Sequence, residues 1–205
     1  MLRPLKEIPL NLVIESISGN KVIPFNKKNT KDIDLLKNLI KVAKKSVEGT
    51  NKSGIKRPRP NEVGNDIEIF VKKALNKVGY KANIPTTQKG KKKSTGYPDI
   101  EFIDKHGRTN YLECETYNIK NIATAQRSFY LSPSDDFKIT KNAHHFVISF
   151  EVYIAGRRNK NNIYKCKSWK IIDITKLSVD VKYEFQSDNN RLYSKELILA
   201  EGKAL

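Results

Sequence analysis

Cysteine is scarce in this chain of 205 residues, since only Cys114 and Cys166 occur and they lie far apart. Their number and spacing fit neither a disulfide framework nor the paired cysteines of a zinc site, so we expect both thiols to be reduced. Long apolar runs are lacking too, and no stretch approaches the ~20 residues that a membrane-crossing helix requires. The N-terminus also lacks the uninterrupted apolar core of a signal peptide. These absences predict a soluble, cytoplasmic protein with no membrane contact.

Acidic residues are outnumbered by basic ones, because 22 Asp and Glu stand against 39 Lys and Arg, a formal net charge of +17. Such an excess attracts polyanions by long-range electrostatics. Nucleic acid is therefore the leading class of partner, and a merely solvated basic surface is the simpler alternative.

The length fits one domain over residues 1–205 with a single core. Its patterns divide it into a helical and irregular N-terminal region (1–60), a central region that carries the candidate site (61–153), and a C-terminal region of strands (154–205).

Two amphipathic helices are predicted in the first half of the chain, from Thr30 to Val47 and from Asn61 to Val78. In both, apolar residues recur at spacings of three and four, and Thr30 and Asn61 are the expected N-caps. Residues 1–28 are expected to be irregular or short extended structure. Residues 49–60 are rich in glycine, proline and cations, which predicts a mobile connection.

Runs typical of β-strands follow the second helix. Tyr97–Ile103 and Thr109–Thr116 predict a hairpin, Ile119–Tyr130 a third helix, and Ala143–Tyr153 a central strand. Three further strands are expected at Trp169–Ile174, Val179–Phe185 and Arg191–Leu199. This order of elements predicts an α/β fold with a mixed sheet flanked by helices.

Three carboxylates are predicted to converge on this hairpin. Side chains alternate along a strand, so Glu113 and Glu115 share one face while Leu112 and Cys114 share the other. Pairing of the hairpin brings Asp99 across to the end of the second strand, near Glu115. Such a cluster repels itself unless it holds a cation, and hard oxygen ligands suit Mg²⁺. The expected chemistry is metal-dependent hydrolysis of a phosphodiester.

At these residues the chain resembles the PD-(D/E)xK nuclease superfamily, through Pro98-Asp99 and Glu113-Cys114-Glu115. Glu115 stands where most members have lysine, so the resemblance is to type II restriction endonucleases that carry Glu-x-Glu. It covers about Asn61 to Tyr153 and implies a restriction-endonuclease-like core. Glu115 would act as general base or orient the attacking water.

The resemblance also implies an acid on the helix before the Asp99 strand, which Glu68 matches, with Glu62 as the alternative. The implied metal ligands are then Asp99, Glu113 and Glu68, and all three join Glu115 as catalytic residues. Glu62 is better explained as a charge at the helix N-terminus.

DNA contacts are predicted from three groups of residues. The loop before Asp99 carries four lysines suited to phosphate contacts, the third helix carries a Gln-x-x-x-Tyr element with an adjacent arginine, and a basic stretch follows the central strand. The predicted DNA-binding residues are Lys89, Lys91, Lys92, Lys93, Gln126, Arg127, Arg157 and Arg158.

Other residues are assigned structural roles. His144 and His145 begin an apolar strand and lack the companion ligands of a metal site. His106 is expected in a turn, and Glu101 in a surface salt bridge.

The preferred hypothesis is a type II restriction endonuclease that acts on double-stranded DNA as a homodimer, because symmetric cutting needs two active sites related by a two-fold axis. It implies a companion DNA methyltransferase. The alternatives are a junction-resolving or repair nuclease of the same fold, and a DNA-binding protein without catalysis.

Overall fold

The computed structural model describes residues 5–124, 129–181 and 197, and the chain forms two compact units. The smaller unit consists of residues 1–8 and 178–205. Within it, Val181 donates its N–H to the carbonyl oxygen of Leu5 at 2.8 Å, and Glu7 donates its N–H to Asp180 Oδ1 at 2.9 Å. These contacts lie beside a short two-stranded sheet, made of β1 (Ile8–Pro9) and β8 (Ser178–Val179).

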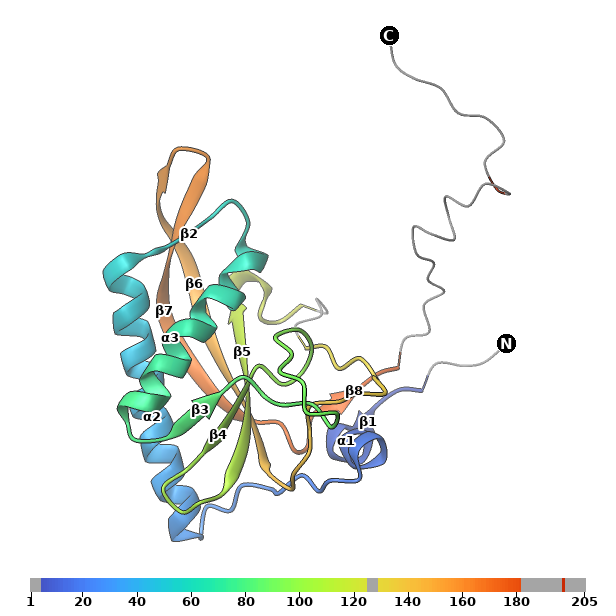
Figure 1. The fold of residues 1–205 in the computed structure, drawn as a ribbon. Helices are drawn as coiled ribbons and strands as arrows, with labels where there is room; N and C mark the ends of the chain where they lie inside the picture. Colours follow the sequence, from blue (N-terminus) through green and yellow to red (C-terminus); the bar gives the residue numbers. More distant parts are fainter. Residues whose placement is uncertain (1–4, 125–128, 182–196, 198–205) are drawn as a thin grey trace. The chain divides into compact units, whose positions relative to one another are not determined.

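The larger unit, residues 9–177, is built on a six-stranded sheet with the order β2-β7-β6-β5-β4-β3 (Figure 1). Neighbouring strands are antiparallel except for β5 and β6, which are parallel. The sheet is therefore mixed, as predicted. Its strands are β2 (Ile55–Arg57), β3 (Lys81–Asn83), β4 (Ile100–Ile103), β5 (Thr109–Tyr117), β6 (His144–Arg158) and β7 (Asn161–Asp173).

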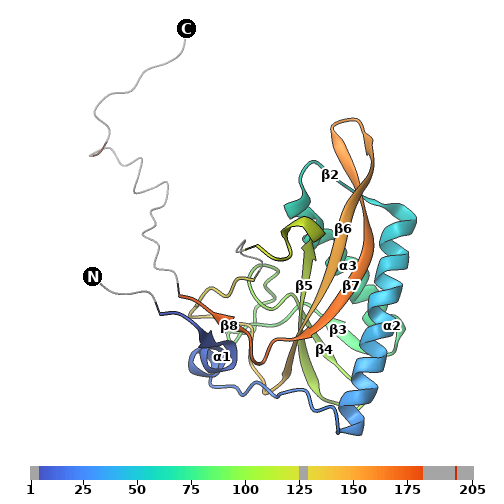
Figure 2. The ribbon, with the colours of Figure 1, turned by 180° about the vertical axis from the view of Figure 1, so that it is seen from behind.

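Two helices, α2 (Thr30–Ser53) and α3 (Val63–Lys77), cover the same face of this sheet (Figures 1 and 2). Their apolar stripes and the facing strand residues form one core. Fully buried members of it are Leu35, Leu39, Ile67, Val71, Phe102, Leu112 and Ile148. In the described part of the chain, no helix is long and apolar enough to cross a membrane.

The N-terminal third holds more regular structure than the sequence predicted. Helix α1 (Leu10–Ser18) lies in a region expected to be irregular, and it buries Leu10 and Ile14. Helix α2 is capped by Asn29 instead of Thr30, since the Asn29 side chain accepts the Lys31 N–H at 2.9 Å. It also runs into the predicted mobile connection.

Residues 55–57 of that connection form β2, which pairs with β7 through Ile55 and Tyr164. A strand of three residues is too short to show a period, so its pairing partner decides it. Helix α3 begins at Val63 and not at Asn61, because residues Pro60–Glu62 form a 3₁₀ turn first.

The predicted third helix is wrong over the part that can be described. Residues Ile119–Asn121 form a single 3₁₀ turn, in which the Asn118 side chain accepts the Lys120 N–H at 2.9 Å. This bond caps the turn as Asn29 caps α2, but residues 122–124 do not continue it as an α-helix. Gln126 and Arg127 lie outside the described residues, as do most of the strands predicted at 179–185 and 191–199.

The central strand is confirmed, but β6 and β7 are longer than predicted and form a ribbon, which projects beyond the helices (Figures 1 and 2). Pairing continues to Arg158 and Asn161. Asn159, in the tight turn between them, has a φ of 56°, a conformation that asparagine tolerates better than most residues. The basic stretch after the central strand therefore lies on a β-ribbon.

Both cysteines are free and buried, as expected for reduced thiols. Burial raises the pKa of the Cys114 thiol well above its usual value and that of Cys166 to about 11.

Candidate active site

The β4–β5 register brings Asp99 and Glu113 together. Ile100 pairs with Leu112, so Asp99 lies opposite Glu113, two residues before the predicted neighbour Glu115. Asp99 donates its backbone N–H to Glu113 Oε2 at 3.1 Å, and Asp99 Oδ2 accepts the N–H of Cys114 at 2.9 Å. Each acid is thus bound to the backbone next to the other.

Alternation along β5 separates the acids from the core. Leu112 and Cys114 are buried beneath the helices, whereas Glu113 and Glu115 point to the opposite face and are partly buried there. We call Asp99, Glu113 and Glu115 the acid cluster. Among the residues that the structure describes, none of the three forms an ion pair with a lysine, arginine or histidine.

Burial and mutual repulsion make these carboxylates hard to ionise. Burial, followed by the charges of Asp99 and Glu115, raises the pKa of Glu113 to about 9. Burial and then Asp99 raise the pKa of Glu115 to about 7. Burial also raises the pKa of Asp99, although the hydrogen bond from Cys114 and the charge of Lys138 oppose the shift. A cation would relieve this repulsion.

Glu68 on α3 lies within the field of the acid cluster. Burial raises its pKa, followed by the charge of Asp99, while Lys72 and Lys138 oppose the shift. The Lys72 Nζ lies 3.8 Å from Glu68 Oε1. Glu62, the alternative, is 3.6 Å from Arg57 and does not appear among the charges that act on the cluster.

As the side chains stand, no group of three or more His, Cys, Asp or Glu in the described residues is arranged to hold a metal ion. Two carboxylate oxygens, Asp99 Oδ2 and Glu113 Oε2, are turned toward backbone N–H groups. Mg²⁺, however, keeps several waters and is often held by one or two carboxylates together with substrate phosphate. The donor set of Asp99 and Glu113, with Glu68 nearby, fits that requirement.

A buried lysine also faces the cluster, and the sequence interpretation missed it. Lys138 is 3% exposed, and its Nζ donates to the carbonyl oxygen of Pro98. Burial lowers its pKa, while the charges of Asp99, Glu113 and Glu68 act in the opposite direction. Nothing in the local sequence marks this lysine, because its neighbours in space come from other elements.

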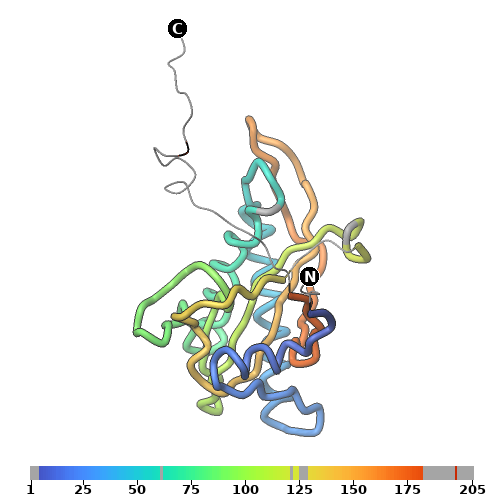
Figure 3. The backbone as a smooth tube through the Cα atoms, turned by 90° about the vertical axis from the view of Figure 1, so that its right-hand side faces the viewer, coloured from blue at the N-terminus to red at the C-terminus, as the bar shows by residue number. Residues whose placement is uncertain are grey.

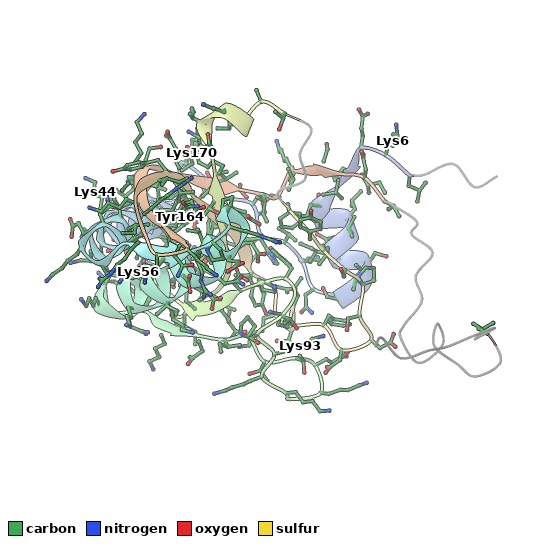
Figure 4. The ribbon with its side chains drawn as sticks, turned by 90° about the horizontal axis from the view of Figure 1, so that it is seen from above. Lys6, Lys44, Lys56, Lys93, Tyr164 and Lys170 are labelled. Atoms are coloured by element: carbon green, nitrogen blue, oxygen red, sulfur yellow. The ribbon has the colours of Figure 1, made fainter. Side chains whose placement is uncertain are left out.

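The four lysines predicted to bind phosphate are exposed on a loop at residues 88–96, the lysine loop, which leads into Asp99. Figure 4 labels Lys93 on this loop and Lys170 on β7. The first residues of the loop are bonded to the segment that contains Asp136 and Phe137. Gln88 donates its N–H to Phe137 O at 3.0 Å, and Lys89 donates its N–H to Asp136 Oδ1 at 2.9 Å.

The arginines predicted to bind DNA lie elsewhere. Arg157 and Arg158 are exposed near the tip of the β6–β7 ribbon, where Arg157 Nε donates to Asn162 Oδ1 at 3.0 Å. Six residues separate Arg157 from Glu151, the β6 residue paired with the end of β5, which corresponds to ~20 Å along a strand. The structure does not bring these arginines to the acid cluster.

The histidines have structural contacts. His145 is buried, with Nδ1 at 2.7 Å from Tyr97 Oη, and burial lowers its pKa to about 3. His144 Nδ1 lies 2.8 Å from Ile23 O. His106 lies in the β4–β5 turn, and Glu101 forms an ion pair with Lys141 at 2.8 Å, as expected.

Comparison with known protein families and proteins shows that the chain is similar to restriction enzymes. A model of the type II restriction enzyme MjaV family matches residues 4–196. The chain is similar to the type II restriction enzyme MjaV of Methanocaldococcus jannaschii, with 42% identity over 216 residues that cover 98% of this chain and 91% of the relative. No solved structure matches the chain.

Proposed function

The chain belongs to the type II restriction enzyme MjaV family, and on that premise we propose that it cuts duplex DNA with the acid cluster as its active site. It is a site-specific restriction endonuclease. The observation that carries the assignment of the site is the reciprocal pair of hydrogen bonds, which holds Asp99 and Glu113 side by side without an ion-pair partner among the described residues.

We infer that the site is a Glu-x-Glu variant of the PD-(D/E)xK arrangement. Its support is the order of elements around the acids: α3 with Glu68, Asp99 immediately before β4, Glu113 and Glu115 on antiparallel β5, and then β6 parallel to β5. Glu115 occupies the position of the usual lysine.

Asp99 and Glu113 are the proposed ligands of Mg²⁺, with Glu68 beside them. A divalent ion bound there supplies Lewis-acid polarisation of the scissile phosphate and lowers the pKa of water. Glu115 lies two residues beyond Glu113 on the same face, ~7 Å along the strand. From that position its carboxylate accepts a proton from the attacking water or orients it.

DNA is proposed to lie across the exposed side of this site. The lysine loop adjoins Asp99 and supplies phosphate contacts, whereas the β6–β7 ribbon with Arg157 and Arg158 has the shape that enters a major groove. Gln126 and Arg127, outside the described residues, remain proposed contacts. A homodimer with a two-fold axis would cut both strands, and a companion methyltransferase would protect the same site.

The test compares Asp99→Ala with Glu101→Ala on plasmid and linear duplex DNA. Both are carboxylates of the same hairpin, but Glu101 is paired with Lys141. With Mg²⁺ the wild type and Glu101→Ala are expected to give the same discrete fragments, and Asp99→Ala none, while Ca²⁺-supported DNA binding remains in all three. Cleavage by Asp99→Ala would refute the assigned site. A smear, or cutting of four-way junctions alone, would instead refute sequence-specific cleavage.

A further inference from the structure

Lys138 is the only lysine or arginine among the buried residues of the described part of the chain. A buried ammonium group is costly unless other groups compensate for the lost hydration. Among the described residues, its Nζ has one such partner at hydrogen-bond distance, the carbonyl oxygen of Pro98. The other compensation is the charge of Asp99, Glu113 and Glu68, while Lys93 acts against it.

The Pro98 carbonyl belongs to the same peptide unit as the Asp99 N–H. That unit is therefore held at both ends, by Lys138 Nζ at the oxygen and by Glu113 Oε2 at the N–H, 3.1 Å away. A donor at the oxygen polarises the amide and strengthens the bond that its N–H makes. Besides its charge, Lys138 thus acts on Asp99 and Glu113 through one peptide group, and in the described part of the chain it forms no ion pair with either carboxylate.

The segment that carries Lys138 is fixed on both sides of it. Residues 131–141, the strap, run beside the lysine loop (Figure 3), and Phe137 O accepts the Gln88 N–H at 3.0 Å. On the other side, Thr140 donates its N–H to Tyr111 Oη at 3.0 Å. Both anchors use backbone atoms of the strap, so neither requires the Lys138 side chain.

We propose that Lys138 is a positioning residue for the cleavage reaction: it fixes the Pro98–Asp99 peptide and thereby the two carboxylates that receive the metal. This inference rests on the proposed function of the acid cluster. Lys138 lies far from the motif in the sequence, and the motif has Glu115 at the last position in place of the usual lysine. The inference gives Lys138 a supporting role beside that motif.

A simpler role would be that of a counter-ion, which only offsets the negative charge of the acids. The two roles predict opposite changes in metal affinity. Loss of a counter-ion leaves the acids more negative, so a divalent cation binds more tightly. Loss of a positioning residue disorders the ligands, and such outer partners typically contribute 10–100-fold to metal affinity or activity.

The experiment measures Ca²⁺ affinity of the full chain by titration calorimetry, and single-turnover cleavage with Mg²⁺, for Lys138→Met, Lys138→Gln and the wild type. The control is Lys141→Met, in the same strap, whose amine pairs with Glu101. We expect Lys138→Met to bind Ca²⁺ about tenfold more weakly and to cut about 100-fold more slowly. Lys141→Met should match the wild type in both.

Glutamine can still donate to the Pro98 carbonyl, so Lys138→Gln is expected to keep Ca²⁺ affinity within about threefold of wild type. If Lys138→Met does not fold, Lys138→Gln alone tests the proposal. A tenfold increase or decrease in its Ca²⁺ affinity overturns the proposal. Unchanged or tighter Ca²⁺ binding by a folded Lys138→Met also overturns it. If the wild type binds no Ca²⁺ and cuts no DNA, the acid cluster itself is wrongly assigned, a different failure.

Discussion

Two groups of carboxylates lie at opposite ends of the β4–β5 hairpin and differ in their partners. At the turn, Arg108 donates to Asp104 Oδ2 at 2.8 Å and pairs with Asp32. Burial alone would raise the pKa of Asp32, but hydrogen bonds, chiefly from Arg108, lower it. At the other end, burial and then the charge of Asp99 raise the pKa of Glu113. Carboxylates paired with a cation stabilise the fold. Carboxylates held together without a cation lower the stability of the fold, which is typical of functional sites.

The strongest test of this contrast is Glu113→Gln. The substitution keeps the shape and removes one charge, so we expect a loss of cleavage of at least about 1000-fold, because a proposed metal ligand disappears. Melting of the metal-free protein should occur at the same temperature or higher, since the folded state no longer has to keep this buried carboxyl protonated. Single-turnover assays and thermal unfolding of one preparation give both values. A variant that loses activity only because it melts earlier would contradict the contrast.

The converse substitution is Arg108→Met at the turn. It leaves Asp32 and Asp104, whose side chains are 3% and 1% exposed, without their cation. Removal of one partner from such a buried network is expected to lower the free energy of unfolding by about 3 kcal/mol. Urea denaturation measures this loss. Cleavage per folded molecule should stay near wild type at low temperature. Loss of cleavage would show that the group formed by Arg108, Asp32 and Asp104 is also functional.

The pH dependence of stability should have opposite signs at the two ends. The pKa of Glu113 is raised to about 9 in the folded protein. Its contribution to folding stability is therefore fully present below its ordinary pKa of 4.5 and is lost as pH rises toward 9. The stability gain of Glu113→Gln should therefore grow from about pH 5 to about pH 9.

Asp32 has a lowered pKa, so its contribution is present above its ordinary value of 3.8 and is lost only in stronger acid. The stability difference between wild type and Asp32→Asn should therefore stay constant over the range in which that of Glu113→Gln grows. Thermal unfolding in EDTA checks both curves. Addition of Ca²⁺ should abolish the pH dependence of the stability difference between wild type and Glu113→Gln. The stability difference between wild type and Asp32→Asn should be unchanged.

The smallest expected effect, on DNA binding, concerns one lysine of the lysine loop and one lysine of the β4–β5 turn. Lys92 is exposed on the lysine loop, which leads into Asp99, and Lys105 is exposed in the β4–β5 turn near Arg108. Lys92→Gln is expected to weaken duplex binding a few-fold and to lower the salt-dependence slope by about 1, whereas Lys105→Gln should change neither. Fluorescence anisotropy over a salt series measures both. Equal effects would show that the whole basic surface binds DNA without preference.

The hairpin and its acids could be predicted because strand alternation and turn residues are local signals. The alternation put Glu113 and Glu115 on one face, as observed, but the register could not be fixed from sequence. It depends on the conformation of the Asp104–Arg108 turn, which is closed by an Asp104 N–H to Arg108 O bond of 3.0 Å. Asp99 consequently lies beside Glu113 and not beside Glu115.

Other features depend on tertiary partners, and the sequence did not reveal them. Strand β2 exists because β7 continues past the core and offers an edge to Ile55. Lys138 faces the acids because the strap is tied to Gln88 and Tyr111, residues that are remote from it in the chain. Neither relation leaves a periodic pattern. The helix predicted at 119–130 is reduced, in its described part, to the single 3₁₀ turn Ile119–Asn121.

The burial of both thiols gives this protein a practical use as a clean background for site-directed labelling. Cys114 and Cys166 are free and buried, and burial raises the pKa of each, so little reactive thiolate forms at neutral pH. A maleimide dye should therefore modify a single introduced cysteine, for example at Lys160 in the tight turn of the β6–β7 ribbon. Energy transfer from that position to a dye on duplex DNA would follow the approach of the ribbon tip to the groove, without replacing either native cysteine.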